Sequence, residues 1–283
     1  MHPLPSTHAP IGVFDSGVGG LSVLREIRQQ LPGESLIYAA DSGHAPYGNK
    51  PTAEVQARAE AMTDALRQQG CKALVVACNT VTGLSIQALR ARHPDVPMVA
   101  IEPAVKPAAA MTRTGIIGVL ATQNTVDSAG LARLIAQHAQ GVTVITKACP
   151  GWVERIERGE LDDVTTRAAV DAYVQPVVAA GADVLVLGCT HYPFLRASIQ
   201  ACAGPSVAVL DPAASVAREL VRRLEAAHLT RAYRPGDPPG SMQWWTTGDP
   251  ALAQRVMQGL WPEPIRVRAL SEAVSCPPPS CGQ

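Results

Sequence analysis

Short apolar runs alternate with helical patterns along most of the chain. The runs lack polar–apolar alternation, as expected for strands that helices cover on both faces. Strands are predicted at Ile11–Phe14, Leu36–Ala40, Leu74–Ala77, Met98–Ile101, Ile116–Leu120, Val142–Ile145, Val184–Leu187 and Val207–Leu210. Helices are predicted at Leu21–Gln30, Thr52–Gln69, Asn124–Gln140, Thr165–Ala180 and Ala213–Ala227. Alternating strands and helices imply parallel sheets joined by right-handed crossovers, so the predicted fold class is α/β.

The pattern changes in the last third of the chain. Arg234–Gly240 is a loop by composition, and a strand is predicted at Gln243–Thr247. A helix near Pro250–Leu260 and a strand near Ile265–Val267 follow. The segment 271–283 has too few apolar groups to dock, and we expect it to be a disordered tail.

Two of the predicted strands end in nearly the same way. ALVVACNT (residues 73–80) and VLVLGCTH (residues 184–191) each run an apolar strand into a cysteine followed by small polar residues. Ligands of open α/β sheets bind beyond the carboxyl ends of the strands. We therefore expect Cys78 and Cys189 to face each other across a cleft between two halves, which meet near Ile101–Lys106. Two thiols so placed suit an enzyme that removes a proton from one face of a carbon and returns one to the other.

The other thiols are Cys71, Cys149, Cys202, Cys276 and Cys281. We interpret these as reduced, because a disulfide scaffold would be shorter and denser in cysteine. No metal is expected, since a zinc site needs paired spacing such as C-x₂-C with histidines nearby. A free cysteine is often only a small buried apolar residue. Either Cys78 or Cys189 alone would be as readily structural as catalytic, and it is the duplication that favours catalysis.

The loop DSGVGG, residues 15–20, leads from the first strand into the first helix. Its glycines let backbone N–H groups approach a ligand, and a helix N-terminus favours an anion such as a carboxylate or phosphate. The spacing matches neither nucleotide-binding glycine motif, so nucleotide binding has little support. The alternative is a tight turn in which Asp15 or Ser16 caps the helix.

The loop after the second strand, Asp41–Pro51, is long for a simple turn. Pro46 and Gly48 would fix its backbone and leave Tyr47 and nearby amides free to meet a ligand, although a plain loop explains the segment as well. Near the thiols, His191 could hold the Cys189 thiolate or pass it a proton.

Composition narrows the class of function. The chain has 283 residues, with 24 Lys and Arg against 24 Asp and Glu, so no whole-chain field favours nucleic acid or an anionic membrane. No stretch approaches the ~20 apolar residues of a membrane span, and the first residues lack the order of a signal peptide. We expect a cytoplasmic protein with neither nucleic-acid nor membrane partners.

Together these segments resemble the glutamate racemases of the cofactor-independent aspartate/glutamate racemase superfamily. The matching stretches are FDSGVGGLS (14–22), AADS (39–42), PYG (46–48), VVACNT (75–80) and LGCTHYP (187–193), with weaker similarity at GVLAT (118–122), Thr125, Ser128 and ACP (148–150). The similarity runs from about residue 11 to 227 and less clearly to 270. It implies two flavodoxin-like domains, 8–101 plus 211–270 and 102–210, with the active site in the cleft between them.

The resemblance also implies roles for individual residues. Cys78 would accept the proton of the D-enantiomer and Cys189 that of the L-enantiomer, supported by Asp15 and His191 respectively. Positions that match substrate-binding residues are Asp15, Ser16, Pro46, Tyr47, Gly48, Asn79, Thr80, Thr122, Thr190 and His191.

Glu157 aligns with an acidic residue that assists the second cysteine. Glu154 and Arg155, however, stand where the family usually has less charged residues. By spacing alone, this cluster is typical of a solvated helix face.

The predicted chemistry is a two-base racemisation of glutamate. One cysteine must be a thiolate while the other is a thiol, which predicts a bell-shaped pH–rate profile. Catalysis by pyridoxal phosphate needs a Schiff-base lysine, and none of Lys50, Lys72, Lys106 and Lys147 has a persuasive setting. We therefore expect no cofactor. The product D-glutamate would supply peptidoglycan synthesis in a bacterium, and family members form homodimers in several arrangements.

Other functions remain compatible with the sequence at this point. The nearest is a related enzyme, such as an aspartate or hydantoin racemase or a maleate-type isomerase, since the length of the pocket decides between them. A non-catalytic amino-acid-binding module is a second, although the intact Cys78, Cys189, Asp15 and His191 argue against it. A thiol redox protein would usually show C-x-x-C.

Overall fold

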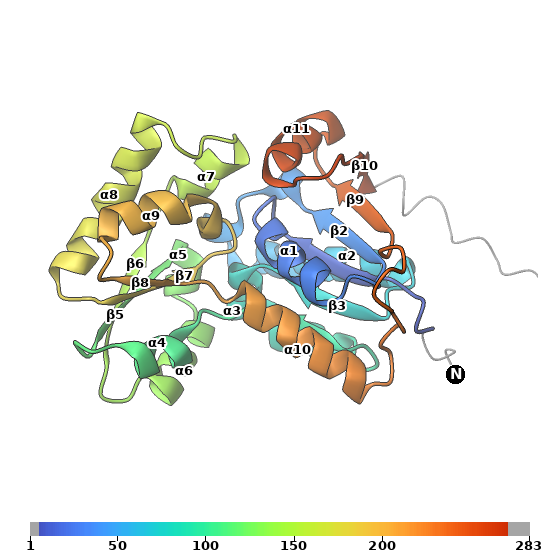
Figure 1. The fold of residues 1–283 in the computed structure, drawn as a ribbon, viewed down its shortest axis with the longest axis horizontal. Coiled ribbons are helices and arrows are strands. Elements are labelled where there is room, and N and C mark those ends of the chain that lie inside the picture. Colours follow the sequence, from blue (N-terminus) through green and yellow to red (C-terminus); the bar gives the residue numbers. More distant parts are fainter. Residues whose placement is uncertain (1–5, 271–283) are drawn as a thin grey trace, which may run out of the picture.

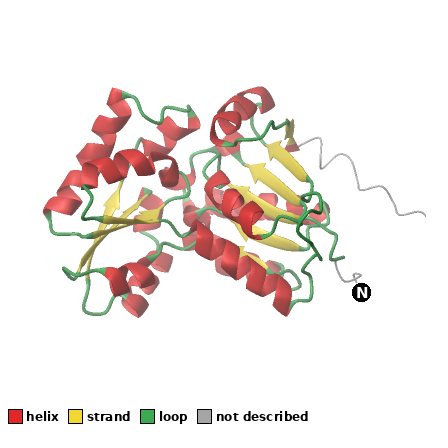
Figure 2. Ribbon diagram, viewed as in Figure 1, coloured by secondary structure: helices red, strands yellow, loops and turns green. Residues whose placement is uncertain are grey.

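The computed structural model describes residues 6–270 and contains two parallel β-sheets (Figures 1 and 2). The first sheet has the order β10-β9-β2-β1-β3-β4 and the second β6-β5-β7-β8. The strands of the first are β1 (Ile11–Asp15), β2 (Leu36–Ala40), β3 (Ala73–Val76), β4 (Met98–Ala100), β9 (Met242–Thr246) and β10 (Val267–Ala269). Those of the second are β5 (Ile116–Ala121), β6 (Thr143–Ala148), β7 (Val184–Gly188) and β8 (Ala208–Leu210). The predicted α/β class is confirmed.

Helices cover both faces of each sheet (Figure 2). They are α1 (Leu21–Gln30), α2 (Thr52–Gln68), α3 (Asn79–Arg92), α4 (Val105–Met111), α5 (Gln123–Val126), α6 (Ala129–His138), α7 (Trp152–Glu157), α8 (Val164–Ala179), α9 (Arg196–Ala203), α10 (Ala213–Ala226) and α11 (Pro250–Leu260). Short 3₁₀ turns lie at Ser42–His44, Tyr47–Asn49 and Tyr192–Leu195. The sequence predictions omitted α3, α4, α7 and α9.

The central strands are apolar because both of their faces are covered. All residues of β1, β2, β3 and β7 are buried. Each large aliphatic side chain removed from water in this way contributes about 1.5–3 kcal/mol before the entropy of ordering is subtracted. The sheets therefore give rigid support to the residues that follow the carboxyl ends of their strands.

Two predicted elements differ from the observed ones. The helix predicted at Asn124–Gln140 is two helices, because the Ser128 hydroxyl accepts a hydrogen bond from Leu131 N at 3.1 Å and begins α6 afresh. The strand predicted at Ile265–Val267 is found at Val267–Ala269, because the N–H groups of Ile265 and Val267 donate to glutamine side chains of α11.

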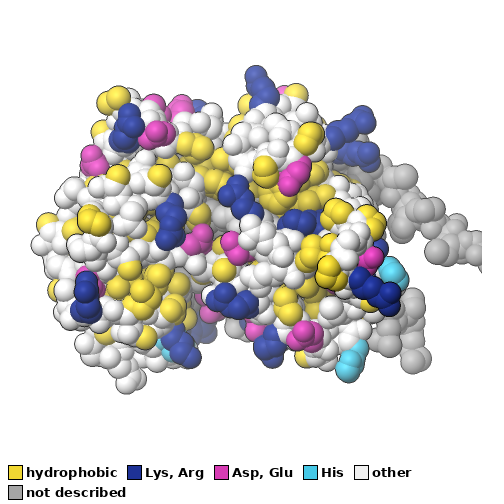
Figure 3. All heavy atoms as spheres, in the orientation of Figure 1, with side chains coloured by type: hydrophobic (Ala, Val, Ile, Leu, Met, Phe, Trp, Pro, Cys, Tyr) yellow, Lys and Arg dark blue, Asp and Glu magenta, His cyan; other side chains and the backbone are white. Residues whose placement is uncertain are grey.

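The first sheet takes its strands from both ends of the described chain and the second from its middle. Figure 1 shows β9 and β10 (red) beside the blue strands, and α10 packs against α1. The exact domain limits stay a prediction, and the tail predicted at 271–283 lies outside the described residues. Within residues 6–270, no helix is long and apolar enough to cross a membrane. Charged side chains of both signs are interspersed on the face drawn in Figure 3.

Candidate active site

Asp41, Asp15 and Cys78 lie at the ends of three adjacent strands. Asp15 ends β1, Asp41 follows β2 on one side, and Cys78 follows β3 on the other. Because the strands are parallel, all three side chains come to the same edge of the sheet. They are almost fully buried, with exposed fractions of 0% for both carboxyl groups and 4% for Cys78.

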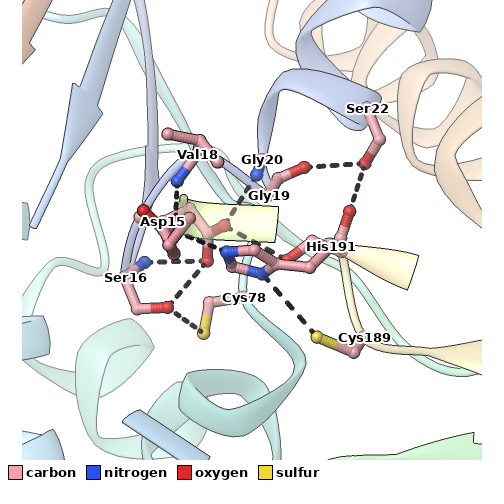
Figure 4. A network of polar contacts seen from close by, with 12 residues as sticks. Asp15, Ser16, Val18, Gly19, Gly20, Ser22, Cys78, Cys189 and His191 are labelled. Carbon is pink, nitrogen blue, oxygen red and sulfur yellow. Dashed lines mark hydrogen bonds and ion pairs between the residues drawn. The ribbon is translucent and has the colours of Figure 1, made fainter. Parts of the chain in front are cut away.

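The Asp15 carboxyl group organises the loop between β1 and α1 (Figure 4). Its Oδ1 accepts from Ser16 N at 2.7 Å and its Oδ2 from Gly20 N at 2.6 Å. Oδ2 also accepts from the Thr190 hydroxyl at 3.1 Å, which links the first sheet to the segment after β7. Burial raises the pKa of Asp15, and the charge of His191 partly offsets that rise.

Cys78 stands at the start of α3, with its sulfur 3.9 Å from the Ser16 hydroxyl. Burial raises the pKa of this thiol well above its ordinary value, and the charge of Asp15 raises it further. Cys78 is therefore a neutral thiol near neutral pH.

Cys189, which follows β7 of the second sheet, begins a second chain of polar contacts. Its sulfur lies 3.7 Å from His191 Nδ1, and His191 Nε2 lies 2.6 Å from Glu157 Oε1. Burial lowers the pKa of His191, but the hydrogen bonds to Cys189 and Glu157 outweigh it and hold this pKa well above its ordinary value. In Figure 4 both cysteine sulfurs lie on the same side of the network.

The glycines of the β1–α1 loop make room for this chain of contacts. A Cβ atom on Gly17 would lie 1.8 Å from Glu157 Oε1, and one on Gly19 would lie 2.2 Å from His191 Nδ1. Val18 N also donates to Glu157 Oε1 at 2.8 Å. The close approach that these glycines permit is therefore to the protein's own side chains.

This finding changes our interpretation of the glycine loop. The sequence favoured an external anion at the N–H groups of residues 15–20. In the structure, Asp15 occupies two of these N–H groups and Glu157 a third. The bound anions are thus two carboxylates of the chain itself.

The loop at residues 46–50 is held from both sheets. The Tyr47 hydroxyl donates to Asp41, so it is not free for a ligand as the sequence had suggested. From α5, the Asn124 amide donates to the carbonyls of Tyr47 and Lys50, at 2.9 Å each. Gly48 faces Thr122, since a Cβ atom there would lie 2.9 Å from Thr122 Cβ.

Hydroxyl groups join the sheets below this loop. Thr80 Oγ1 lies 3.1 Å from Thr122 Oγ1, which lies 3.0 Å from Thr125 Oγ1. Next to Thr80, the Asn79 side chain is buried and both its nitrogen and its oxygen lack a partner among the described residues. Such an amide is costly unless a ligand or water satisfies it.

Cavities border the site. One of about 100 Å³ lies beside Pro46, Gly48 and Thr122, and another of about 280 Å³ lies beside Val18 and Glu157. Within the described residues, no cluster of three or more His, Cys, Asp or Glu could hold a metal ion.

The structure thus brings the predicted residues to one place, at facing strand ends of the two sheets. Sequence reasoning missed Asp41 and Asn124, which hold the 46–50 loop. Asp41 lies directly after a predicted strand and within the AADS stretch of the resemblance, but it was not singled out as a site residue. Asn124 carried no such signal, because it was only the first residue of a predicted helix.

Residues 11–220 match the family model for Asp/Glu/hydantoin racemases. The chain belongs to the Asp/Glu/hydantoin racemase family. A glutamate racemase from Ectopseudomonas mendocina is 50% identical over 261 residues, covering 92% of this chain and 98% of that protein.

Solved structures of Asp/Glu/hydantoin racemase family members agree with the fold. The glutamate racemase of Francisella tularensis, solved with D-glutamate, has a TM-score of 0.81 at 26% identity and covers 94% of this chain and 99% of that one. The Escherichia coli enzyme, solved with L-glutamate and the activator UDP-MurNAc-Ala, has a TM-score of 0.79 at 31% identity, covering 92% and 97%.

Proposed function

We propose that the protein is a glutamate racemase that interconverts L- and D-glutamate with Cys78 and Cys189 as its two bases. The observation that carries this proposal is the placement of two thiols at facing strand ends, each with its own polar support. Asp15 and Ser16 lie beside Cys78, and His191 with Glu157 lies beside Cys189. Relatives that share about half of the sequence carry the same activity in their names.

The proposed reaction passes one proton in and one proton out. In the L-to-D direction the Cys189 thiolate removes the α-proton, and the Cys78 thiol donates its proton to the opposite face of the α-carbon. The neutral state of Cys78 suits this direction. The L-to-D reaction leaves Cys189 as a thiol and Cys78 as a thiolate, which is the state that the reverse reaction needs. The enzyme returns to its starting state when Cys189 loses a proton and Cys78 gains one.

The α-carbanion needs electrostatic support, since an amino-acid α-proton is very weakly acidic. We assign the substrate carboxylate to hydrogen-bond donors at Ser16, Asn79, Thr80 and Thr190, and to the backbone N–H groups of Tyr47 and Gly48, which follow Pro46. Thr122 lies between this set and the second sheet. Donors fixed in a dry cleft stabilise developing charge more than water does.

No cofactor takes part in this proposal. A homodimer and a cytoplasmic location remain predictions, and so does the supply of D-glutamate to peptidoglycan synthesis. Substrates of different length, such as aspartate, are the alternative.

The deciding experiment is incubation of the reduced protein with L-glutamate in D₂O without added cofactor. Circular dichroism follows loss of optical activity, and NMR follows deuterium at the α-carbon. We expect the wild type to lose optical activity and to incorporate deuterium at the α-carbon. We expect neither change with Cys78→Ser or Cys189→Ser. If the α-proton of aspartate but not of glutamate exchanges, the mechanism stands and the substrate is aspartate. If no amino acid exchanges its α-proton, the result favours a non-catalytic binding module.

A further inference from the structure

Strand β2 carries a buried carboxylate at each end. Before the strand, Glu34 pairs with Lys72, whose Nζ lies 2.5 Å from Glu34 Oε2. After the strand, Asp41 accepts two hydrogen bonds from Arg58, at 2.9 and 2.8 Å. Both carboxylates are buried, with exposed fractions of 2% and 0%. Only Asp41 lies at the edge of the sheet where the site is built.

The Asp41 carboxylate accepts hydrogen bonds from side chains that lie in different parts of the sequence. The Thr247 hydroxyl, after β9, donates to its Oδ1 at 2.6 Å, and His44 Nδ1 lies 3.1 Å from the same oxygen. The Tyr47 hydroxyl donates to Oδ2. Burial raises the pKa of Asp41, but hydrogen bonds from Arg58, Thr247 and Tyr47 bring it below the ordinary value. The carboxylate is therefore charged at neutral pH, with Arg58 as its counter-ion.

These contacts fix the loop from the first sheet, and Asn124 holds it from the second. The side chain of Tyr47 points to Asp41, and its carbonyl accepts from Asn124 of the second sheet. A loop that is ordered before the ligand arrives does not lose conformational entropy on binding. Its order therefore affects ground-state binding more than the chemical step.

We propose that Asp41, neutralised by Arg58, is the positioning residue that holds the backbone of residues 46–48 ready for the substrate carboxylate. The proposal rests on the proposed function, because it takes glutamate as the substrate of this loop. Asp41 itself touches no substrate and acts through Tyr47.

The test compares two isosteric variants at the two ends of the same strand. Asp41→Asn should raise the KM for L- and D-glutamate about tenfold, because a buried charged acceptor loses its charge, while kcat stays within about threefold. Glu34→Gln removes an equally buried charge from the far end, so it should lower the melting temperature and leave KM unchanged. Tyr47→Phe, which removes a single donor, should raise KM less than Asp41→Asn.

The double variant Asp41→Asn with Tyr47→Phe tests whether the two residues act as one unit. We expect its KM to equal that of Asp41→Asn alone, since residues that share one contact are not additive. Amide hydrogen exchange in residues 44–50, measured without substrate, should be faster in Asp41→Asn and in Tyr47→Phe than in Glu34→Gln.

Three results separate the hypotheses. A wild-type KM and unchanged exchange in Asp41→Asn would overturn the positioning role while racemisation stands. Equal KM changes in Asp41→Asn and Glu34→Gln would overturn it too, because they would reflect general destabilisation. A wild type that leaves glutamate unchanged would defeat the proposed function, and the exchange experiment would still decide whether Asp41 fixes the loop.

Discussion

His191 Nε2 lies 2.6 Å from Glu157 Oε1, and the same oxygen accepts a hydrogen bond from Val18 N at 2.8 Å. One carboxylate oxygen thus joins the imidazole beside Cys189 to the loop that carries Asp15. The contact connects α7, the segment after β7 and the β1–α1 loop. Sequence spacing alone had suggested a solvated helix face for Glu157, so the contact of its partly exposed side chain with His191 is a consequence of tertiary packing.

Glu157→Gln should weaken both activity and stability. The variant keeps the shape of the side chain but removes the charge that helps to raise the pKa of His191. We expect kcat to fall at least about tenfold and the free energy of unfolding to fall by about 2 kcal/mol near neutral pH. The surface variant Glu160→Gln, three residues beyond the end of α7, should change neither. Wild-type kcat in Glu157→Gln would contradict a role in the proton transfers.

The same contact predicts a pH dependence of stability. The pKa of His191 is raised in the folded state, so protonated His191 contributes its full stability below the unfolded pKa of about 6.5. That contribution is lost as the pH rises through the raised folded value. In Glu157→Gln this contribution should be smaller and its loss should be complete at a lower pH, which urea unfolding across the pH range and NMR titration of the imidazole would both detect. Parallel stability curves for the two proteins would show that the Glu157 charge does not act on His191.

Gly19→Ala should disable the site without changing any acid or base. A Cβ atom at this position would lie 2.2 Å from His191 Nδ1, so the imidazole must shift from its position beside Cys189. We expect at least about a tenfold loss of kcat. Gly259→Ala in α11 is the matched control, because within the described residues a Cβ atom there would meet nothing within 4 Å beyond its own stretch of helix. That variant should be as active as the wild type and up to about 1 kcal/mol more stable.

Cys78 should react slowly with a neutral alkylating agent near neutral pH. Its pKa is raised by burial and by Asp15, and only the thiolate is nucleophilic. The rate of Cys78 modification by iodoacetamide, followed by mass spectrometry, should still rise above pH 9.0, the ordinary value for a thiol. Cys78→Ser identifies the modified peptide. A plateau below pH 8 would mean that the thiol is ionised more readily than its surroundings indicate.

The fold was predictable because the segments with the clearest apolar pattern are the ones that form the buried core. Each apolar run without alternation became a strand that helices cover, and most boundaries moved by a residue or two. The helix predicted at Asn124–Gln140 was wrong because Ser128 begins a second helix within it, and the prediction did not use this capping signal. The shifted strand at Val267–Ala269 depends on α11 side chains that no local pattern reveals.

The site was predictable only in part. The equivalent ends of two predicted strands indicated that Cys78 and Cys189 lie at one site, because the carboxyl ends of parallel strands lie at the same edge of a sheet. The partners of Asp41, in contrast, come from α2 and from the segment after β9. Their convergence depends on how the sheet orders its strands, and spacing along the chain does not contain that information.

Asn124 provides the last prediction, because it is the contact that joins the second sheet to the 46–50 loop. Its amide donates to the carbonyls of Tyr47 and Lys50, so Asn124→Ala removes two hydrogen bonds of 2.9 Å. At about 1 kcal/mol each, their loss should raise the KM for both enantiomers by roughly five- to thirtyfold, with a smaller change in kcat. Asn124→Asp should be worse than Asn124→Ala, because a carboxylate would then face two carbonyl oxygens. Gln123→Ala, next in the chain and bonded only to Asp127 among the described contacts, should keep the wild-type KM. If Asn124→Asp binds glutamate as well as Asn124→Ala, the amide does not hold the loop through these donors.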